Sequence, residues 1–459
     1  MSSCERQHRD GIRRLLAGVA AAVALTLGTS GCLLQVLGDG SDHSKVLPEV
    51  AWAPPVGMPD EVRTDVELRQ MAQAVLDRRA RALREGNLSD FAVDIDRSDP
   101  DFVAAQRRLF DNLQQLPVQV LDFEVEKDTW NTNYAEDKWE STALIPFVRE
   151  HLQLLGFDRY PVETVFGVTF AERGGRWRIV SDTDVSQMTA DGAQETPWDL
   201  TAIKVVDGDG VLGIFDEGSI DSAETVMSAA EHSIDIVSRA LPVKWDRSVV
   251  LYALSDKTAL SRLGGIPGGD LDSLSGISFP VYQDIERSAR MASVRVLVHP
   301  DYISAIEPRH DVLLTHEMTH VAVARKSGGA PIWMQEGLAE YVATNGADEK
   351  YWWVSRDLAE RAAEGSTEMP NSYKFNTVDQ DWNYSMSLMA CDYIADVYGV
   401  DTLWDVFTAL QRNDWAQTDE QQEEVLLKEI GIDSSELARR AARRMVETSA
   451  YVDLYDVSA

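Results

Sequence analysis

The sequence predicts an α+β protein made of two parts, each combining helices with a small sheet. In the first part, two amphipathic helical stretches precede several strand-like stretches, an order typical of an α+β domain. In the second part, short strands and helices lead into a mostly helical C-terminal portion. With 459 residues, 44% of them hydrophobic and 26% charged, the chain is globular and long enough for two or three domains.

Residues 1–32 have the features of a secretory leader. A basic start is followed by the apolar run Leu15 to Leu27, which is too short to span a bilayer as a mature helix. Small residues then lead to Cys32, and the segment Thr29-Ser30-Gly31-Cys32 resembles the lipobox of bacterial lipoproteins. The resemblance implies a lipid on Cys32 that anchors the chain to the outer face of the cell membrane. The alternative is an ordinary signal peptide in which Cys32 has no role.

Residues 33–59, rich in Gly, Ser, Asp and Pro, read as a flexible tether, and residues 60–182 as the first domain. Helical periodicity predicts helices over Val62 to Arg84 and Phe102 to Leu113. Strands are expected at Val118 to Val125, Ser141 to Val148, Thr164 to Ala171 and Trp177 to Ser181, with Gly174-Gly175 as a hairpin turn. This order is similar to the cone-shaped NTF2-like fold. An accessory domain is the favoured interpretation, and a ligand bound in the cone is the alternative.

Residues 183–199 read as a linker, and residues 200–459 as the second domain. Strands are expected at Val211 to Phe215, Ser248 to Leu254 and Val294 to Val298, with helices at Ser222 to Ala240 and Lys257 to Leu263 and a Gly-rich loop over Gly264 to Gly276. Further helices are predicted over Asp311 to Lys326, Ala330 to Val342, Asp401 to Leu410, Gln421 to Ile430 and Ser434 to Met445.

The predicted helix over residues 311–326 contains His316-Glu317-Met318-Thr319-His320, an H-E-x-x-H motif. Helix residues four apart share a face, with side chains about 5–6 Å apart, so His316 and His320 can hold one zinc ion through neutral imidazoles. Glu317 lies beside the metal, where it can take a proton from water. The motif therefore predicts a zinc hydrolase.

A catalytic zinc site needs a third protein ligand, and the next predicted helix offers two carboxylates. Glu336 and Glu340 are four residues apart and share a helix face. One can ligate the metal while the other receives the N–H of a ligand histidine. From the residues alone, either glutamate can take either role.

Trp333-Met334-Gln335-Glu336-Gly337-Leu338-Ala339-Glu340-Tyr341 resembles the W-x-x-E-G-x-A-x-Y segment of gluzincin peptidases, which include the M1 aminopeptidase group and the bacterial peptidase MA-like domains. The resemblance covers residues 211–446 and is specific between 313 and 341. It implies a Zn²⁺ peptidase acting on peptides or proteins, with Glu336 as the third ligand and Glu340 as the partner of a ligand histidine. The reverse assignment of the two glutamates is the alternative.

The same resemblance suggests two further features. Tyr384 begins a stretch similar to the Y-x-x-G segment in which M1-like enzymes carry a tyrosine that donates to the oxyanion, although Ser387 replaces the glycine. The alternative is that Tyr384 is a core or surface aromatic residue. The strand over residues 293–298 is expected to be the sheet edge beside the substrate. No G-x-M-x-N exopeptidase signature precedes the metal helix, which disfavours an aminopeptidase.

Charge and cysteine content exclude other classes. A formal net charge of −33 disfavours binding to nucleic acid. Of the three cysteines, Cys4 and Cys32 belong to the leader, so the mature chain has neither a disulfide framework nor a cysteine zinc site. An envelope lipoprotein that is inactive, or that acts on something other than peptides, remains the alternative function.

Overall fold

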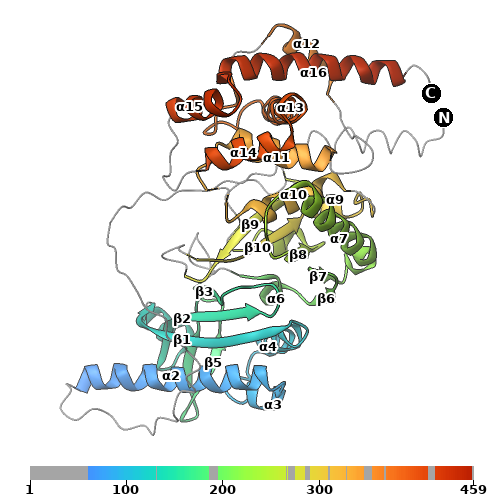
Figure 1. The fold of residues 1–459 in the computed structure, drawn as a ribbon. Helices are drawn as coiled ribbons and strands as arrows, with labels where there is room; N and C mark the ends of the chain where they lie inside the picture. The colour runs from blue at the N-terminus through green and yellow to red at the C-terminus, as the bar shows by residue number, and fades with distance from the viewer. Residues whose placement is uncertain are drawn as a thin grey trace.

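The computed structural model describes residues 60–130, 132–185, 195–264, 266, 274–284, 290–308, 311–326, 328–345, 354–365, 368–411 and 419–456. The predicted leader, Cys32 and the tether over 33–59 lie outside the described residues. The described chain is an α+β protein with two five-stranded sheets (Figure 1). Within this part of the chain, no helix is long and apolar enough to cross a membrane.

The first part of the chain places helices on an antiparallel sheet. Helices α2 (Asp60–Arg84), α3 (Leu88–Phe91) and α4 (Pro100–Leu113) precede the strands β1 (Val118–Trp130), β2 (Ala143–Leu154), β3 (Val162–Gly167), β4 (Thr169–Arg173) and β5 (Arg176–Ser181), with α5 (Thr132–Trp139) between β1 and β2. The strand order is β1-β2-β4-β5, and β3 also pairs with β2. Gly174 and Gly175, both with positive φ, join β4 to β5 at the predicted turn.

A short helix, α6 (Pro197–Leu200), leads to the second sheet, whose order is β6-β7-β8-β10-β9. Its strands are β6 (Ile203–Asp207), β7 (Val211–Asp216), β8 (Val249–Ala253), β9 (Gly276–Tyr282) and β10 (Met291–Val298). Strands β7, β8 and β10 are parallel, and β6 and β9 are antiparallel to their neighbours. The remaining elements are the 3₁₀ turn η1 (Ile220–Ser222) and the helices α7 (Ala223–Ala240), α8 (Lys257–Leu260), α9 (Pro300–Ile303), α10 (Val312–Val323), α11 (Ile332–Asn345), α12 (Arg356–Ala363), α13 (Gln380–Tyr398), α14 (Val400–Leu410), α15 (Asp419–Glu429) and α16 (Ser434–Asp456).

The prediction that residues 293–298 form the sheet edge is wrong. These residues belong to β10, which pairs with β8 on one side and with β9 on the other. The end strand next to α10 is β9, which the sequence did not reveal. Gly276 opens β9 and Pro280 lies inside it, and both residue types weaken the strand pattern; Pro is tolerated here because β9 is the last of the described strands in this sheet.

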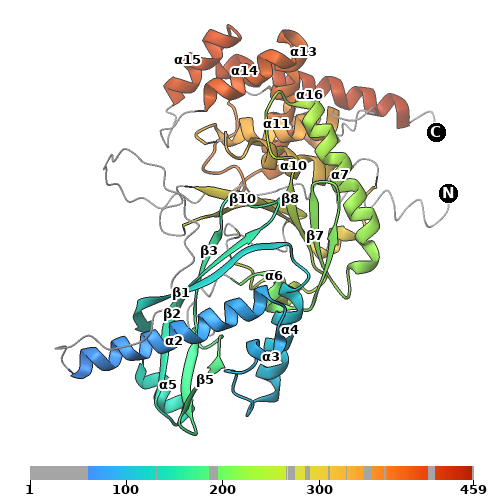
Figure 2. The ribbon, with the colours of Figure 1, turned by 60° about the horizontal axis from the view of Figure 1, so that its bottom comes forward.

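Both faces of the second sheet are buried. Because strand residues alternate between faces, Val211 and Phe215 of β7 pack toward α7 and α10, whereas Leu212 and Ile214 pack the other way. That opposite face joins one continuous core with α2, α4 and the first sheet. The second sheet therefore lies between the N-terminal part and the C-terminal helices (Figure 2).

Candidate metal centre

Helix α10 carries the H-E-x-x-H motif and is fixed at its start by Asp311. The Asp311 carboxylate accepts hydrogen bonds from the backbone N–H of Leu314 at 2.8 Å and of Glu307 at 3.2 Å, and from the Tyr302 hydroxyl at 3.2 Å. An aspartate at this position satisfies N–H groups that have no partner within the helix. Helix α10 then runs between α7, α11 and the second sheet, and this packing buries both apolar and polar faces of the motif.

Helix α11 returns beside α10 and approaches α13 closely at Gly337. A Cβ at that position would lie 2.5 Å from the backbone oxygen of Ser387 and 2.7 Å from Cys391 Sγ. Only glycine allows the two helices to approach this closely. The preceding residue, Glu336, is thereby held with its carboxylate against α10.

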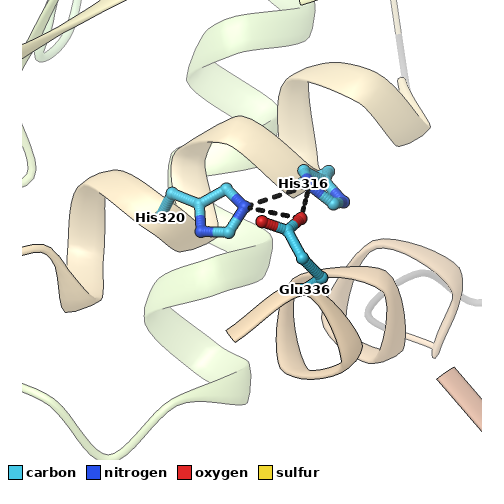
Figure 3. A group of neighbouring side chains, drawn as sticks. All are labelled: His316, His320 and Glu336. Carbon is cyan, nitrogen blue, oxygen red and sulfur yellow. Dashed lines mark hydrogen bonds and ion pairs between the residues drawn. The ribbon is translucent and has the colours of Figure 1, made fainter. Parts of the chain in front are cut away.

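Three side chains from these helices converge (Figure 3). The Nε2 atoms of His316 and His320 are 3.0 Å apart, and Glu336 Oε2 lies 3.2 Å from the first and 3.4 Å from the second. His316 and Glu336 are fully buried and His320 is 6% exposed. The three atoms therefore form a nearly equilateral triangle, shielded from solvent.

The size and chemistry of this triangle fit a zinc ion. Zinc binds imidazole nitrogen and carboxylate oxygen at about 2.0–2.2 Å in tetrahedral geometry, which places two ligand atoms about 3.3 Å apart. The three observed separations, 3.0, 3.2 and 3.4 Å, match this expected distance between two ligand atoms. The Glu336 carboxylate is buried, and its Oε2 faces the two imidazole nitrogens. A buried carboxylate beside two imidazoles can share a cation with them, which would compensate its charge.

The electrostatics of the triangle also suit a cation. Burial lowers the pKa of His316, but the carboxylates of Glu336 and Glu340 outweigh burial and raise that pKa well above its usual value. Burial raises the pKa of Glu336, but His320 and His316 outweigh burial and lower that pKa to about 2. Glu336 is therefore ionised, and its negative charge is available to a metal.

Glu317 lies in the same buried space and is fully buried. Burial raises the pKa of its carboxyl group, and the effect is only partly offset by His316 and His320. A hydrogen bond from Ser278 on β9 acts in the opposite direction and lowers that pKa. A carboxylate whose proton affinity is raised in this way is suited to accept and release a proton.

Glu340 and Tyr384 complete the surroundings of His316. Glu340 Oε1 lies 3.2 Å from His316 Nδ1, on the far side of the ring from Glu336. The Tyr384 ring centroid is 6.4 Å from that of His316. Burial and the carboxylates of Glu336, Glu340 and Glu317 raise the pKa of Tyr384 well above its usual value, so the hydroxyl keeps its proton and can donate it to a hydrogen bond.

The structure thus brings together every predicted site residue that it describes: His316, Glu317, His320, Glu336, Glu340 and Tyr384. Three residues around the site were not predicted: Ser278 on β9, and Phe375 and Asn376 on the loop before α13. Phe375 packs on the Tyr384 ring at 5.0 Å between centroids, and Asn376 Oδ1 lies 3.4 Å from the Tyr384 hydroxyl. These residues lie outside the helical pattern, so no spacing in the sequence could indicate them.

Taken together, the geometry defines a candidate metal centre with two nitrogen ligands and one oxygen ligand on two adjacent helices. A scan against protein-family models matches no family, and a search of curated proteins finds no similar protein.

Proposed function

We propose that this chain is a zinc-dependent peptidase, with His316, His320 and Glu336 as the metal ligands. The observation that carries the proposal is the triangle of ligand atoms with Glu317 beside it. Three protein ligands leave a tetrahedral metal with one open position, which is the arrangement of catalytic zinc sites. The neighbouring carboxylate, Glu317, distinguishes the site from a purely structural one.

His316, His320 and Glu336 would hold the zinc ion, which when bound would lower the pKa of water and polarise the substrate carbonyl. Glu317 accepts the proton of the attacking water and passes it to the leaving amine. The Tyr384 hydroxyl donates a hydrogen bond to the oxygen that becomes negatively charged. Glu340 faces Nδ1 of His316 and fixes the orientation of that ring, so that Nε2 points toward Glu336.

The substrate is proposed to be an extended peptide that adds to β9. This strand lies at the end of the second sheet, beside α10, and its Ser278 is close to Glu317. Backbone hydrogen bonds to such a strand bind peptides without strong dependence on sequence. We further propose that a lipid on Cys32 holds the enzyme at the outer face of a bacterial cell membrane.

The test compares purified protein with a Glu317→Gln variant. The wild-type chain is expected to contain one zinc ion and to cleave casein or a peptide library, and chelation should abolish cleavage. Glu317→Gln should retain stoichiometric zinc and lose at least about 100-fold in kcat, because the proton acceptor is gone while the ligands remain.

Two outcomes would contradict the proposal. Zinc-loaded wild-type protein that cleaves no peptide would point instead to a binding protein or to a hydrolase of other envelope esters or amides. Unchanged turnover by Glu317→Gln would show that this residue is not the base.

A further inference from the structure

The Tyr384 hydroxyl has a neighbour outside the helices that carry the metal triad. This hydroxyl donates to Asn376 Oδ1 at 3.4 Å, and Asn376 lies eight residues before Tyr384, in the segment that leads into α13. The distance is at the long end of the hydrogen-bond range. The Glu336 carboxylate also lies within hydrogen-bond reach of this hydroxyl, so Asn376 is one of two groups that hold it.

The segment that carries Asn376 is fixed to the site helices. The Asn383 side chain, on the first turn of α13, donates two hydrogen bonds of 2.8 Å to the backbone oxygens of Phe375 and Val378. At the other end, the Ser372 hydroxyl accepts from the backbone N–H of Ile332, the first residue of α11, at 3.2 Å. The loop therefore links the helix that bears Glu336 to the helix that bears Tyr384.

Packing restricts the orientation of the Tyr384 ring, and the hydrogen bond to Asn376 restricts the position of its hydroxyl. Phe375 is 1% exposed, and its ring meets that of Tyr384 edge-on, at 72° and 5.0 Å between centroids. Phe375 and Asn376 are consecutive, so one loop fixes both the plane of the phenol and the position of its oxygen. A hydrogen-bond donor that is already in position stabilises the transition state more than one that must reorient during the reaction.

We propose that Asn376 is a positioning residue for the Tyr384 hydroxyl, held in place by Asn383 and acting on an oxyanion that forms at the metal triad. This inference rests on the proposed peptidase function and on the donor role of Tyr384. In the described part of the chain, the Asn376 side chain is hydrogen-bonded to Tyr384 and to none of the three proposed metal ligands. Its effect therefore has to pass through Tyr384.

The test is a double-mutant cycle with Asn376→Ala and Tyr384→Phe. Alone, Asn376→Ala should lower kcat about tenfold with KM within about twofold, because a misplaced donor weakens only the transition state. Tyr384→Phe should lower kcat about 100-fold or more. In the Tyr384→Phe background, Asn376→Ala should have no further effect on kcat.

A second readout is the affinity for a phosphinic peptide, whose tetrahedral anionic group resembles the reaction intermediate. Asn376→Ala should weaken this affinity by about the same factor as kcat, with zinc content unchanged. The matched control is Asn371→Ala, in the same loop, where the side chain accepts from the exposed backbone N–H of Tyr373 at 2.9 Å. That variant should keep kcat and inhibitor affinity within about twofold.

The inference would be overturned if Asn376→Ala lowered kcat equally in the wild-type protein and in the Tyr384→Phe variant. It would also be overturned if Asn376→Ala caused no loss of kcat in the wild-type protein. Full activity of Tyr384→Phe would overturn it while leaving the zinc peptidase intact. Failure of the peptidase proposal would give a different result, because the wild-type protein would then hydrolyse no peptide at all.

Discussion

The two glutamates of α11 have different neighbours, although they share one helix face. Glu336 Oε2 faces both Nε2 atoms, whereas Glu340 Oε1 faces only Nδ1 of His316. Of the two assignments that the sequence left open, this geometry favours Glu336 as the ligand. Glu340 is then the residue that orients the His316 ring.

This difference predicts two distinct losses of zinc affinity. Glu336→Ala removes one of the three proposed ligands, so the purified variant should contain little zinc. Glu340→Ala removes only the partner of a ligand and should weaken zinc binding about 10- to 100-fold. Titration of both apo-proteins against a competing chelator measures the two effects. Stoichiometric tight zinc in Glu336→Ala would reverse the assignment.

At the residue scale, the sequence could predict only groups whose spacing follows a regular helix. His316, Glu317 and His320 share a face because a helix repeats every 3.6 residues, and Glu336 and Glu340 share one for the same reason. Ser278, Phe375 and Asn376 reach the site from a strand and a loop. Their positions depend on how distant segments pack, which a periodic pattern does not encode.

Among the elements, the crossing of α11 and α13 fixes Glu336, the proposed third ligand. Gly337→Ala places a methyl group against the Ser387 backbone oxygen, which cannot move without shifting α13. We expect a loss of about 1–3 kcal/mol in the free energy of unfolding. Zinc affinity should also fall, because Glu336 is the adjacent residue.

The control for this prediction is Gly328→Ala, which lies in the turn between α10 and α11. A Cβ at Gly328 meets no atom within 4 Å, so stability and zinc affinity should be nearly unchanged. Denaturant unfolding and zinc titration measure both variants. Equal stability of the two variants would show that the helix crossing tolerates a side chain.

The first sheet carries a pH-dependent contact across three strands. His151 on β2 is directly opposite Asp122 on β1 and Glu163 on β3, and its Nδ1 lies 2.8 Å from Asp122 Oδ1. The hydrogen bond to Asp122 raises the pKa of His151, and this effect exceeds the opposing effect of burial. Protonated His151 is therefore favoured in the folded protein.

Because the folded pKa is the higher one, this contact stabilises the fold fully below the unfolded pKa of about 6.5 and is lost as pH rises through the folded value. His151→Gln should cost about 1 kcal/mol at pH 5.5 and almost nothing at pH 9, since the pair is partly exposed. Urea unfolding at both pH values measures the difference. A cost that is the same at both pH values would contradict the assignment.

Elements differ in how well the sequence predicts them. The long amphipathic helices α2 and α7 begin within two residues of their predicted starts and end where predicted, because the apolar periodicity and the end signals agree. The short helices α3, α5 and α12 were not predicted, because each has too few turns to show a period. Strand β9 was not predicted, because its Gly and Pro weaken the strand pattern. Without β9 in the prediction, β10 was wrongly taken as the edge strand.

For the whole molecule, the two predicted domains share a core. Leu212, Val250 and Phe279 of the second sheet lie in one cluster with Leu76 of α2 and Phe170 of β4. Without the N-terminal part, this face of the second sheet would be exposed to water. Burial of apolar area at about 25 cal/mol per Å² makes such exposure costly, so the two parts are expected to unfold together.

A buried ion pair joins the two parts at β10. Asp158, in the β2–β3 connection, accepts from Arg295 Nη1 at 2.7 Å and Nη2 at 3.2 Å, and from the Ser293 hydroxyl at 2.6 Å. Both charged side chains are at most 4% exposed. Removing one charge from such a pair leaves the other buried without compensation, which costs far more than the pair itself contributes.

Asp158→Asn should therefore lower the free energy of unfolding by about 3–5 kcal/mol. The matched control is Asp246→Asn, which breaks the neighbouring Arg159–Asp246 pair; those side chains are 47% and 44% exposed, so the loss should be at most about 1 kcal/mol. Because the core is shared, Asp158→Asn should shift one cooperative urea transition, with zinc release and loss of tertiary circular dichroism moving together. Two separate transitions, with zinc retained through the first, would show that the N-terminal part unfolds independently of the metal site.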